Sequence, residues 1–285
     1  MQSLPIACIQ LKNVWMAKLT PFDWYETPVY YDMIFDVGSE RETAFLVGAW
    51  QRHHRLARVP DPLYVLEPAC GSGRLMGQFH RQGWIAHGFD AHPGMIDYAE
   101  RRLAVEGCGS VRVWPDRMEA FTPPNGQRYA LAHCLVSTFK YLLTEEEAQA
   151  HLHLVAEALL PGGLYLLGVH LTDYSRTVYE HERWTASRDG VDVVCNIRGW
   201  PPDRKQRTEE VRSRLKVIKG GHPPQHYETS WTFRTYNAAQ LKRTVREGAP
   251  GLEVAACYDF RYDLAAPRRF DDEYADILLV LRKKI

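Results

Sequence analysis

The sequence lacks an excess of charge of either sign and lacks any long hydrophobic run. Its 285 residues contain 35 Lys plus Arg and 35 Asp plus Glu. A protein that binds nucleic acid usually carries a basic field for phosphate contacts, which this composition does not provide. No window reaches the roughly 18 consecutive apolar residues that a membrane-spanning helix needs. We therefore expect neither a nucleic acid nor a membrane as partner.

Paired cysteines and metal-ligand clusters are missing as well. The six cysteines are scattered, and none belongs to a Cys-x-x-Cys pair. This pattern indicates reduced thiols and a cytoplasmic protein. The histidines at 53–54 and at 151 and 153 have no second group of Cys, His or carboxylate at ligand spacing, so we predict no metal.

The most informative segment that is present is 65–76, Val-Leu-Glu-Pro-Ala-Cys-Gly-Ser-Gly-Arg-Leu-Met. It predicts a buried strand, a glycine turn and a helix, with Gly71 and Gly73 at the turn. The third glycine of the dinucleotide fingerprint is absent, because Met76 stands there. Glu67 would repel a pyrophosphate, but it would pair with an ammonium or accept a ribose hydrogen bond. S-adenosylmethionine fits that description.

This segment resembles the first motif of class I S-adenosylmethionine-dependent methyltransferases, and later segments follow in the family order. An apolar run ends in Asp90, about 20 residues after the glycine loop, where the family places its ribose-binding acid. A strand over 111–114 leads to Asp116, in a segment similar to the one that reads the adenine amino group. Residues 129–147 and the strand 164–170 look like the fourth and fifth segments.

The resemblance implies an α/β fold, a Rossmann-like doubly wound seven-stranded sheet, with S-adenosyl-L-methionine as cofactor. Taken alone, the glycines could form a plain turn, Asp90 could cap a helix and Asp116 could serve a turn, but their joint spacing argues against this. The implied cofactor contacts are Glu67, Ala69, Gly71, Gly73, Asp90, Ala91, Met95, Asp116, Arg117, Met118 and Cys134.

We expect three parts along the chain. Residues 1–20 have no acid and an interrupted apolar pattern, so we expect a disordered extension or a true start at Met16. Residues 21–175 and 237–285 are predicted to form the core. Residues 176–236 are predicted to form an antiparallel β cap inserted after the fifth strand, because they alternate in polarity around a turn at 188–190. This cap resembles that of sugar-amine and glycine-type N-methyltransferases, or it serves only as a homodimer surface.

Candidate catalytic and substrate residues follow from the implied fold. His170 is the first candidate for a base, which a hydroxyl acceptor needs and a neutral amine does not. Its alternative role is to orient the chain into the cap. Tyr30 is the second catalytic candidate, beside Tyr31, although aromatic packing is an equal alternative. The candidate substrate contacts are His133, Ser137, Thr138, Tyr141 and Tyr174 near the strand ends, and Asn196, Arg198, Arg214 and Trp231 in the cap.

The chain has no Asp/Asn-Pro-Pro-Tyr signature after the fourth strand, and His-Cys-Leu-Val-Ser-Thr-Phe stands there instead. This departure favours a small molecule over a nucleic-acid base. We predict an enzyme that methylates a small-molecule acceptor, with an amine favoured over a hydroxyl because the cap resembles the N-methylating branch. The alternatives are an O-methyltransferase that uses His170 as base and a non-catalytic regulatory protein that binds S-adenosylmethionine.

Overall fold

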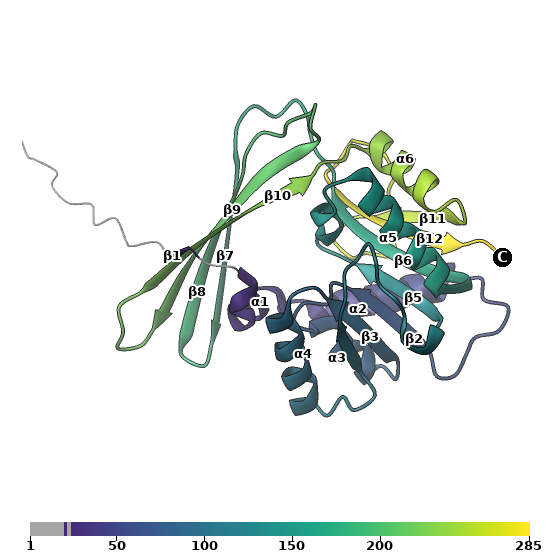
Figure 1. Ribbon diagram of the computed structural model, residues 1–285, viewed down its shortest axis with the longest axis horizontal. Helices are drawn as coiled ribbons and strands as arrows, with labels where there is room; N and C mark the ends of the chain where they lie inside the picture. The colour runs from purple at the N-terminus through teal and green to yellow at the C-terminus, as the bar shows by residue number, and fades with distance from the viewer. Residues whose placement is uncertain (1–19, 22–23) are drawn as a thin grey trace, which may run out of the picture.

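The computed structural model describes residues 20–21 and 24–285, so most of the predicted N-terminal extension lies outside the described residues. The described chain forms a seven-stranded sheet covered by helices and a second, antiparallel sheet that stands beside it (Figure 1). The second sheet is the predicted cap, and its four long strands come from the segment that follows the long strand β6 (Leu159–His170).

The core sheet has the strand order β11-β12-β6-β5-β2-β3-β4. The strands from β6 to β4 pair in parallel, whereas β12 is antiparallel to both β6 and β11. The predicted doubly wound seven-stranded sheet is therefore confirmed. Its strands are β2 (Tyr64–Pro68), β3 (Ile85–Asp90), β4 (Arg112–Pro115), β5 (Tyr129–Cys134), β6 (Leu159–His170), β11 (Leu252–Tyr258) and β12 (Asp276–Lys283).

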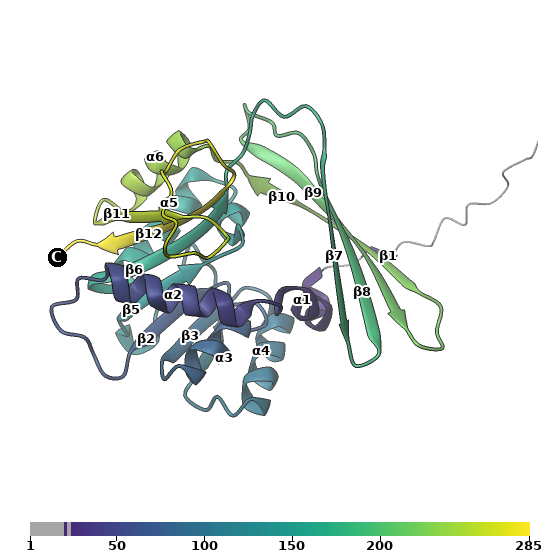
Figure 2. The same ribbon diagram turned by 180° about the vertical axis from the view of Figure 1, so that it is seen from behind.

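Helices cover both faces of this sheet, because its buried strands carry apolar side chains on both sides. One core cluster packs α2, α3 and α4 against one face, and another packs α5 and α6 against the other. Figure 2 shows α2 lying across its face of the sheet. The helices are α2 (Ser39–His53), α3 (Arg74–Arg81), α4 (Pro93–Val105), α5 (Glu145–Ala158) and α6 (Ala238–Gly248), with short 3₁₀ turns η1 (Trp24–Glu26), η2 (Pro124–Gly126) and η3 (Thr138–Tyr141).

The cap is an antiparallel meander, as predicted. Its strands are β7 (Glu180–Arg188), β8 (Val191–Gly199), β9 (Thr208–Lys219) and β10 (Gln225–Arg234), and the short β1 (Thr20–Pro21) pairs with β10. The turn between β7 and β8 has positive φ at Asp189 and Gly190, which suits a tight two-residue hairpin.

Helix α1 (Pro28–Phe35) joins the cap to the core (Figure 1). Its residues Tyr30 and Met33 pack with Val193, Leu215 and Val217 on one face of the cap sheet. We call this face, which carries the side chains directed toward the core, the inner face. The opposite face of the same sheet is the outer face.

Candidate functional site

The glycine turn after β2 has the backbone that its sequence predicts. Ala69, Gly71 and Gly73 all adopt positive φ, at 53°, 55° and 70°. A Cβ on Gly73 would lie 3.2 Å from Leu103 and 3.3 Å from Ala99, so this glycine lets the turn pack against α4. Gly73 therefore supports the site without lining a cavity.

Two carboxylates sit at the ends of the next strands. Asp90 accepts hydrogen bonds from the backbone N–H groups of Gly71 at 2.9 Å and His92 at 2.8 Å. Burial raises the pKa of Asp90, and these hydrogen bonds oppose the shift. Asp116 accepts from the N–H groups of Arg117 at 2.9 Å and Thr122 at 3.1 Å. Both acids line a cavity of about 340 Å³, which we call the β3 cavity, together with Ala69, Gly71, Ala91, Arg117 and Met118.

Glu67 is buried behind the glycine turn and lines a smaller cavity that also touches Cys134. Burial raises the pKa of this carboxyl to about 8, although Arg74 partly opposes the shift. Arg74 itself forms two hydrogen bonds with Glu42, at 3.0 and 2.8 Å. The Oε2 atom of Glu67 has no hydrogen-bond partner in the described structure.

His133 is buried in the core beside Glu67. Its Nδ1 is 4.0 Å from Oε1 of Glu67. Burial lowers the pKa of His133 to about 3, so the ring is neutral at pH 7 and this contact is not an ion pair. The ring stacks on Phe79. His133 lines neither these two cavities nor the larger one described below, so the structure adds no support to the prediction that it contacts substrate.

A much larger cavity, about 980 Å³, lies between the core and the cap, and we call it the cap cavity. The core side provides the loop after β5 and the end of β6, including Ser137, Thr138 and His170. The cap side provides inner-face residues of all four long strands, including Glu182, Trp184, Ile197, Val211, Trp231 and Phe233.

The three cavities meet at two residues. Tyr31 and Thr138 line the β3 cavity, the small Glu67 cavity and the cap cavity. Tyr25 and Tyr141 line both larger cavities, and the Tyr25 hydroxyl donates a 2.7 Å hydrogen bond to Tyr141. Burial raises the pKa of Tyr31 to about 12, so its phenol is neutral. A ligand in the first two cavities would reach the cap cavity at this junction.

The loop that holds Thr138 is strained. Val136 and Ser137 adopt φ of 53° and 62°, and positive φ is unusual for a β-branched residue such as Val136. The Ser137 hydroxyl accepts a 2.8 Å hydrogen bond from the N–H of His170, which ties the loop to β6. Strain of this kind concentrates at functional sites, and no sequence pattern reveals it here.

His170 lines the cap cavity and forms a dyad with Asp276. Its Nδ1 lies 2.7 Å from Oδ1 of Asp276, and its ring packs edge-on against Phe260. A carboxylate can only accept, so Nδ1 carries the proton and Nε2 is left able to accept one. Sequence reasoning missed Asp276, which is brought opposite His170 by the antiparallel pairing of β12 with β6.

Several other predicted residues lie elsewhere. Tyr30 packs in the cluster between α1 and the cap and lines none of the three cavities, whereas its neighbour Tyr31 lines them all. Met95 is fully buried in α4. The Tyr174 hydroxyl is bonded to Thr235 and Gln240, at 2.7 and 3.0 Å, away from the cavity.

Three of the four predicted cap contacts point away from the cavity. Asn196 pairs with Arg214 across β8 and β9, and Arg198 is two residues further along the same face. The cavity is lined instead by the alternate residues, such as Ile197 and Val211. Because strand side chains alternate, Asn196, Arg198 and Arg214 lie on the outer face. Trp231 is on the inner face and does line the cavity.

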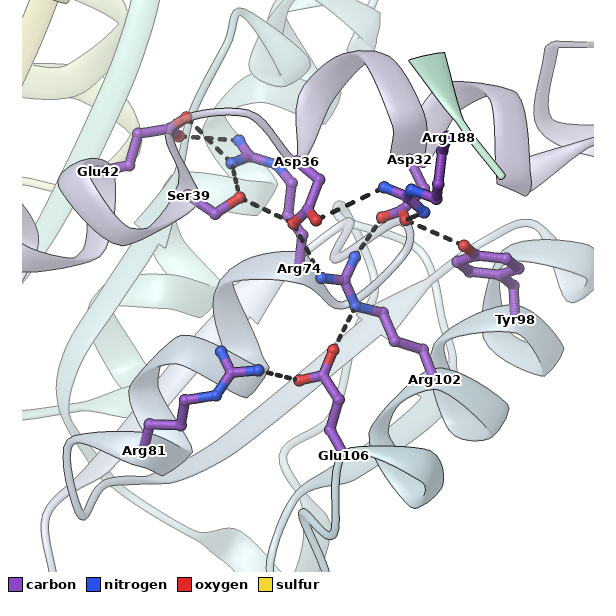
Figure 3. Close-up of polar contacts among 10 residues, drawn as sticks. All are labelled: Asp32, Asp36, Ser39, Glu42, Arg74, Arg81, Tyr98, Arg102, Glu106 and Arg188. Carbon is purple, nitrogen blue, oxygen red and sulfur yellow. Dashed lines mark hydrogen bonds and ion pairs between the residues drawn. The ribbon is translucent and has the colours of Figure 1, made fainter. Parts of the chain in front are cut away.

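An ion-pair network holds α1 against both the core and the cap (Figure 3). Asp32 of α1 is 1% exposed and forms ion pairs with Arg102 of α4 and Arg188 at the end of β7. It also accepts a 3.0 Å hydrogen bond from Tyr98. Asp36 adds a 2.8 Å ion pair with Arg102. The helix that carries Tyr31 is thus fixed from two sides.

The described residues contain neither a metal-ligand cluster nor a membrane-spanning helix. In residues 20–21 and 24–285, no group of three or more His, Cys, Asp or Glu is placed to hold a metal ion. Over the same residues, no helix is both long and apolar enough to cross a membrane. The five cysteines in this part of the chain are free thiols.

Comparison with known proteins agrees with this architecture. The family described as a methyltransferase domain matches residues 65–163, and no curated protein matches the sequence significantly. A solved S-adenosylmethionine-dependent methyltransferase from Clostridium acetobutylicum ATCC 824 is 14% identical, with coverage of 90% of this chain and 96% of that one and a TM-score of 0.69. The resemblance to class I methyltransferases is therefore confirmed for the fold and for the domain at 65–163.

Two further solved structures share the fold. CalS10, an amino pentose methyltransferase from Micromonospora echinaspora solved with S-adenosylmethionine bound, is 18% identical over 93% of this chain and 98% of that one, with a TM-score of 0.66. The sugar N-methyltransferase KedS8 from Streptoalloteichus sp ATCC 53650 is 14% identical, with full coverage of both chains and a TM-score of 0.66. At these identities the likeness establishes the fold.

Proposed function

We propose that this protein transfers a methyl group from S-adenosyl-L-methionine to a small-molecule acceptor, and that the acceptor is an amine. The observation that carries the proposal is the junction at Tyr31 and Thr138, where the cavities beside the glycine turn meet the cap cavity. A donor bound along the ends of β2 and β3 would present one end to a separate acceptor chamber.

The residues beside the glycine turn fit this cofactor. Glu67 has a raised pKa and an oxygen without a partner, so an ammonium group would supply the missing contact and favour the ionised carboxylate. Asp90 lines the β3 cavity while its backbone contacts hold it in place, as an acceptor for ribose hydroxyls requires. Asp116 lies further along the same cavity, where the adenine amino group would lie.

The cofactor supplies an electrophilic methyl group when bound, so the chain's own task is positioning. Tyr31 and Thr138 would hold the acceptor close to the methyl carbon, at about 3–3.5 Å for a reacting pair. The bonded tyrosines Tyr25 and Tyr141 border this point and would help to exclude water. Glu67, Asp90 and Asp116 would hold the cofactor.

An amine acceptor is supported by the cap and by the named activities of proteins with this fold. CalS10 is described as an amino pentose methyltransferase and KedS8 as a sugar N-methyltransferase. The predominance of carboxylates around the cap cavity also favours a basic molecule. We further propose that the protein works in the cytoplasm, in keeping with its free thiols, and forms a homodimer through the cap.

A hydroxyl acceptor is the second candidate, and the His170–Asp276 dyad is the observation that favours it. With Nδ1 donating to Asp276, Nε2 of His170 can take a proton from a hydroxyl in the cap cavity. The same dyad would serve an amine only to remove its proton. The two candidates therefore differ in how strongly they depend on His170.

The test is a methyl-transfer assay with wild-type protein and His170→Ala, using panels of small amines and small phenols. We expect N-methyl products, with His170→Ala retaining activity within about tenfold, because a neutral amine needs no base. A loss of 10²- to 10⁴-fold on an O-methylated product would favour the hydroxyl candidate, since general-base catalysis contributes about that much. Methyl transfer to neither panel by a protein that binds the cofactor would contradict the proposal.

A further inference from the structure

The cap cavity is lined by more acidic than basic side chains. Its lining includes five carboxylates, from Asp173, Glu180, Glu182, Glu209 and Asp276, and two basic side chains, from Lys140 and Arg176. Glu228 also borders the cavity, but its carboxylate pairs with Arg214 on the outer face. Carboxylates in excess of cations attract a cationic ligand and repel an anionic one.

Both basic side chains are already matched by carboxylates. Lys140 is nearly fully buried and bonds to Glu209, which also accepts a 3.0 Å hydrogen bond from Arg176. Arg176 further donates a 2.8 Å hydrogen bond to the carbonyl of Trp200 and contacts Glu180 at 2.7 Å, in an ion pair without hydrogen-bond geometry. A phosphate entering this cavity would have to displace one of these carboxylates.

Two other carboxylates face the cavity from opposite sides. Asp276 lies on the core side and holds His170. Glu182 lies on the inner face of β7, two residues from Trp184, and belongs to no ion pair among the residues that the structure describes. Glu180, Glu209 and Glu228, the other acidic residues of β7 to β10 that line the cavity, each have a basic partner, so Glu182 is the one among these four without an ion pair in the described structure.

Polar atoms without partners point to a ligand independently of these charges. Thr172, which lines the cavity between core and cap, is 9% exposed, and its hydroxyl has no hydrogen-bond partner in the described structure. The indole N–H of Trp231, on the cap side of the same cavity, also lacks one there. Buried polar groups are rarely left unsatisfied, so a ligand with hydroxyl groups would complete both. The rings of Trp184 and Trp231 are suited to a neighbouring cation.

We propose that the cap cavity selects an acceptor with a second cationic group, which binds Glu182, and rejects acceptors that carry a phosphate. This inference rests on the proposed function and names the class of acceptor, a polyhydroxylated diamine. One amine reacts at the junction of Tyr31 and Thr138, while the other stays protonated against the cap. Glu182 is then a specificity-determining residue.

Methyl transfer to such a diamine needs no group other than the cofactor and a proton acceptor. The reacting nitrogen forms a bond to the methyl carbon as the carbon–sulfur bond breaks, and the electron pair of that bond stays on sulfur. The nitrogen then loses one proton, which Nε2 of His170 is placed to accept from the cap cavity. The second amine keeps its proton throughout, so its ion pair with Glu182 is the same before and after transfer.

The experiment measures binding to the protein loaded with the demethylated cofactor, by calorimetry at low salt. The three probes are 2-deoxystreptamine, with two amino groups, glucosamine, with one, and glucosamine 6-phosphate, with one amine and a phosphate. Each is titrated into wild type, Glu182→Gln and the control Glu210→Gln. Glu210 lies on the outer face of the same sheet, where it bonds to Thr232.

We expect the diamine to bind about tenfold more tightly than glucosamine, since a charge-assisted contact of this kind contributes about that factor, and the phosphate probe to bind least. Glu182→Gln should remove the advantage of the diamine, and Glu210→Gln should preserve it. Equal binding of diamine and monoamine, no binding of the diamine at millimolar concentration, or tightest binding of the phosphate would overturn the inference. Failure to bind the demethylated cofactor would instead contradict the proposed function, so the two failures are distinguishable.

Discussion

The proposed cofactor site, which we call the corner and which comprises Glu67, the glycine turn at 69–73, Asp90 and Asp116, differs from the cap cavity in how it is built. The corner is made of backbone groups and carboxylates within one sheet, as in the contact of Asp90 with the N–H of Gly71. The cap cavity is enclosed by side chains of two separate sheets, and α1 and its ion pairs fix one sheet against the other. The carboxylates and the glycine turn of the corner therefore depend on the core fold alone, whereas the cap cavity depends on how the cap is held.

The largest expected effect comes from removing the centre of the α1 network. Asp32→Ala would leave Arg102, whose side chain is 13% exposed, without its most buried partner. Breaking one side of a buried ion pair costs about 3–5 kcal/mol, so denaturant unfolding should show a loss of that size. The exposed Asp97→Ala on α4 is the control. A loss below about 1 kcal/mol would mean that α1 is held by packing and not by these charges.

The second prediction concerns the corner and its pH dependence. Burial raises the pKa of Glu67 from 4.5 to about 8, so the folded protein binds this proton more tightly than the unfolded chain does. Stability from this group is therefore present below pH 4.5 and is lost as the pH rises toward 8. Between pH 5 and 8, the free energy of unfolding of the cofactor-free protein should decline less steeply for Glu67→Gln than for wild type. The measurement is denaturant unfolding of both proteins across this pH range, and the result is the difference between their free energies at each pH.

Histidines with lowered pKa values, such as His133 and His151, make stability rise with pH. Both proteins contain these histidines, so the difference between the two pH profiles reports on Glu67. Identical pH profiles for wild type and Glu67→Gln would mean that Glu67 is already ionised in the cofactor-free protein. The proposal that an ammonium group ionises it would then lose its support.

The smallest expected effect comes from Arg188→Met, which tests whether the cap can be changed without changing the corner. Arg188→Met breaks only the cap's ion pairs with Asp32 and Asp36, and the Arg188 side chain is 36% exposed. Solvent screening limits the loss of stability to under about 1 kcal/mol. We expect cofactor affinity to stay unchanged while acceptor affinity falls, by about threefold for a contact of this strength. Equal losses for cofactor and acceptor would show that the two regions are not independent.

What could be predicted from the sequence follows the same division. Glu67, the glycine turn and Asp90 are close together along the chain, so their spacing predicted a strand, a turn and a second strand end that the structure confirms. The cap of α6 is equally local, since the side chain of Asn237 accepts a 2.8 Å hydrogen bond from the N–H of Gln240. Local geometry of this kind is set by neighbouring residues.

The cap cavity could not be predicted in the same way, because its members meet through pairing between distant strands. A shift of one residue reverses the face of every side chain on a strand, and the alternating pattern placed Asn196, Arg198 and Arg214 on the wrong face. The aromatic run before α2 did not distinguish Tyr30 from Tyr31, since either could face the site on a helix. Asp276 and Glu182 carry no motif, and only the β6–β12 and β7–β8 pairings reveal their places.

The most direct test of the central claim is calorimetric titration of S-adenosyl-L-methionine and its demethylated product into wild type and Asp90→Ala. The account predicts micromolar binding to wild type and a loss of about 2 kcal/mol, roughly thirtyfold, in the variant, because ribose hydroxyls would lose a charged acceptor. No binding of either compound to wild type, or equal binding to both proteins, would contradict the assignment of the cofactor to this corner.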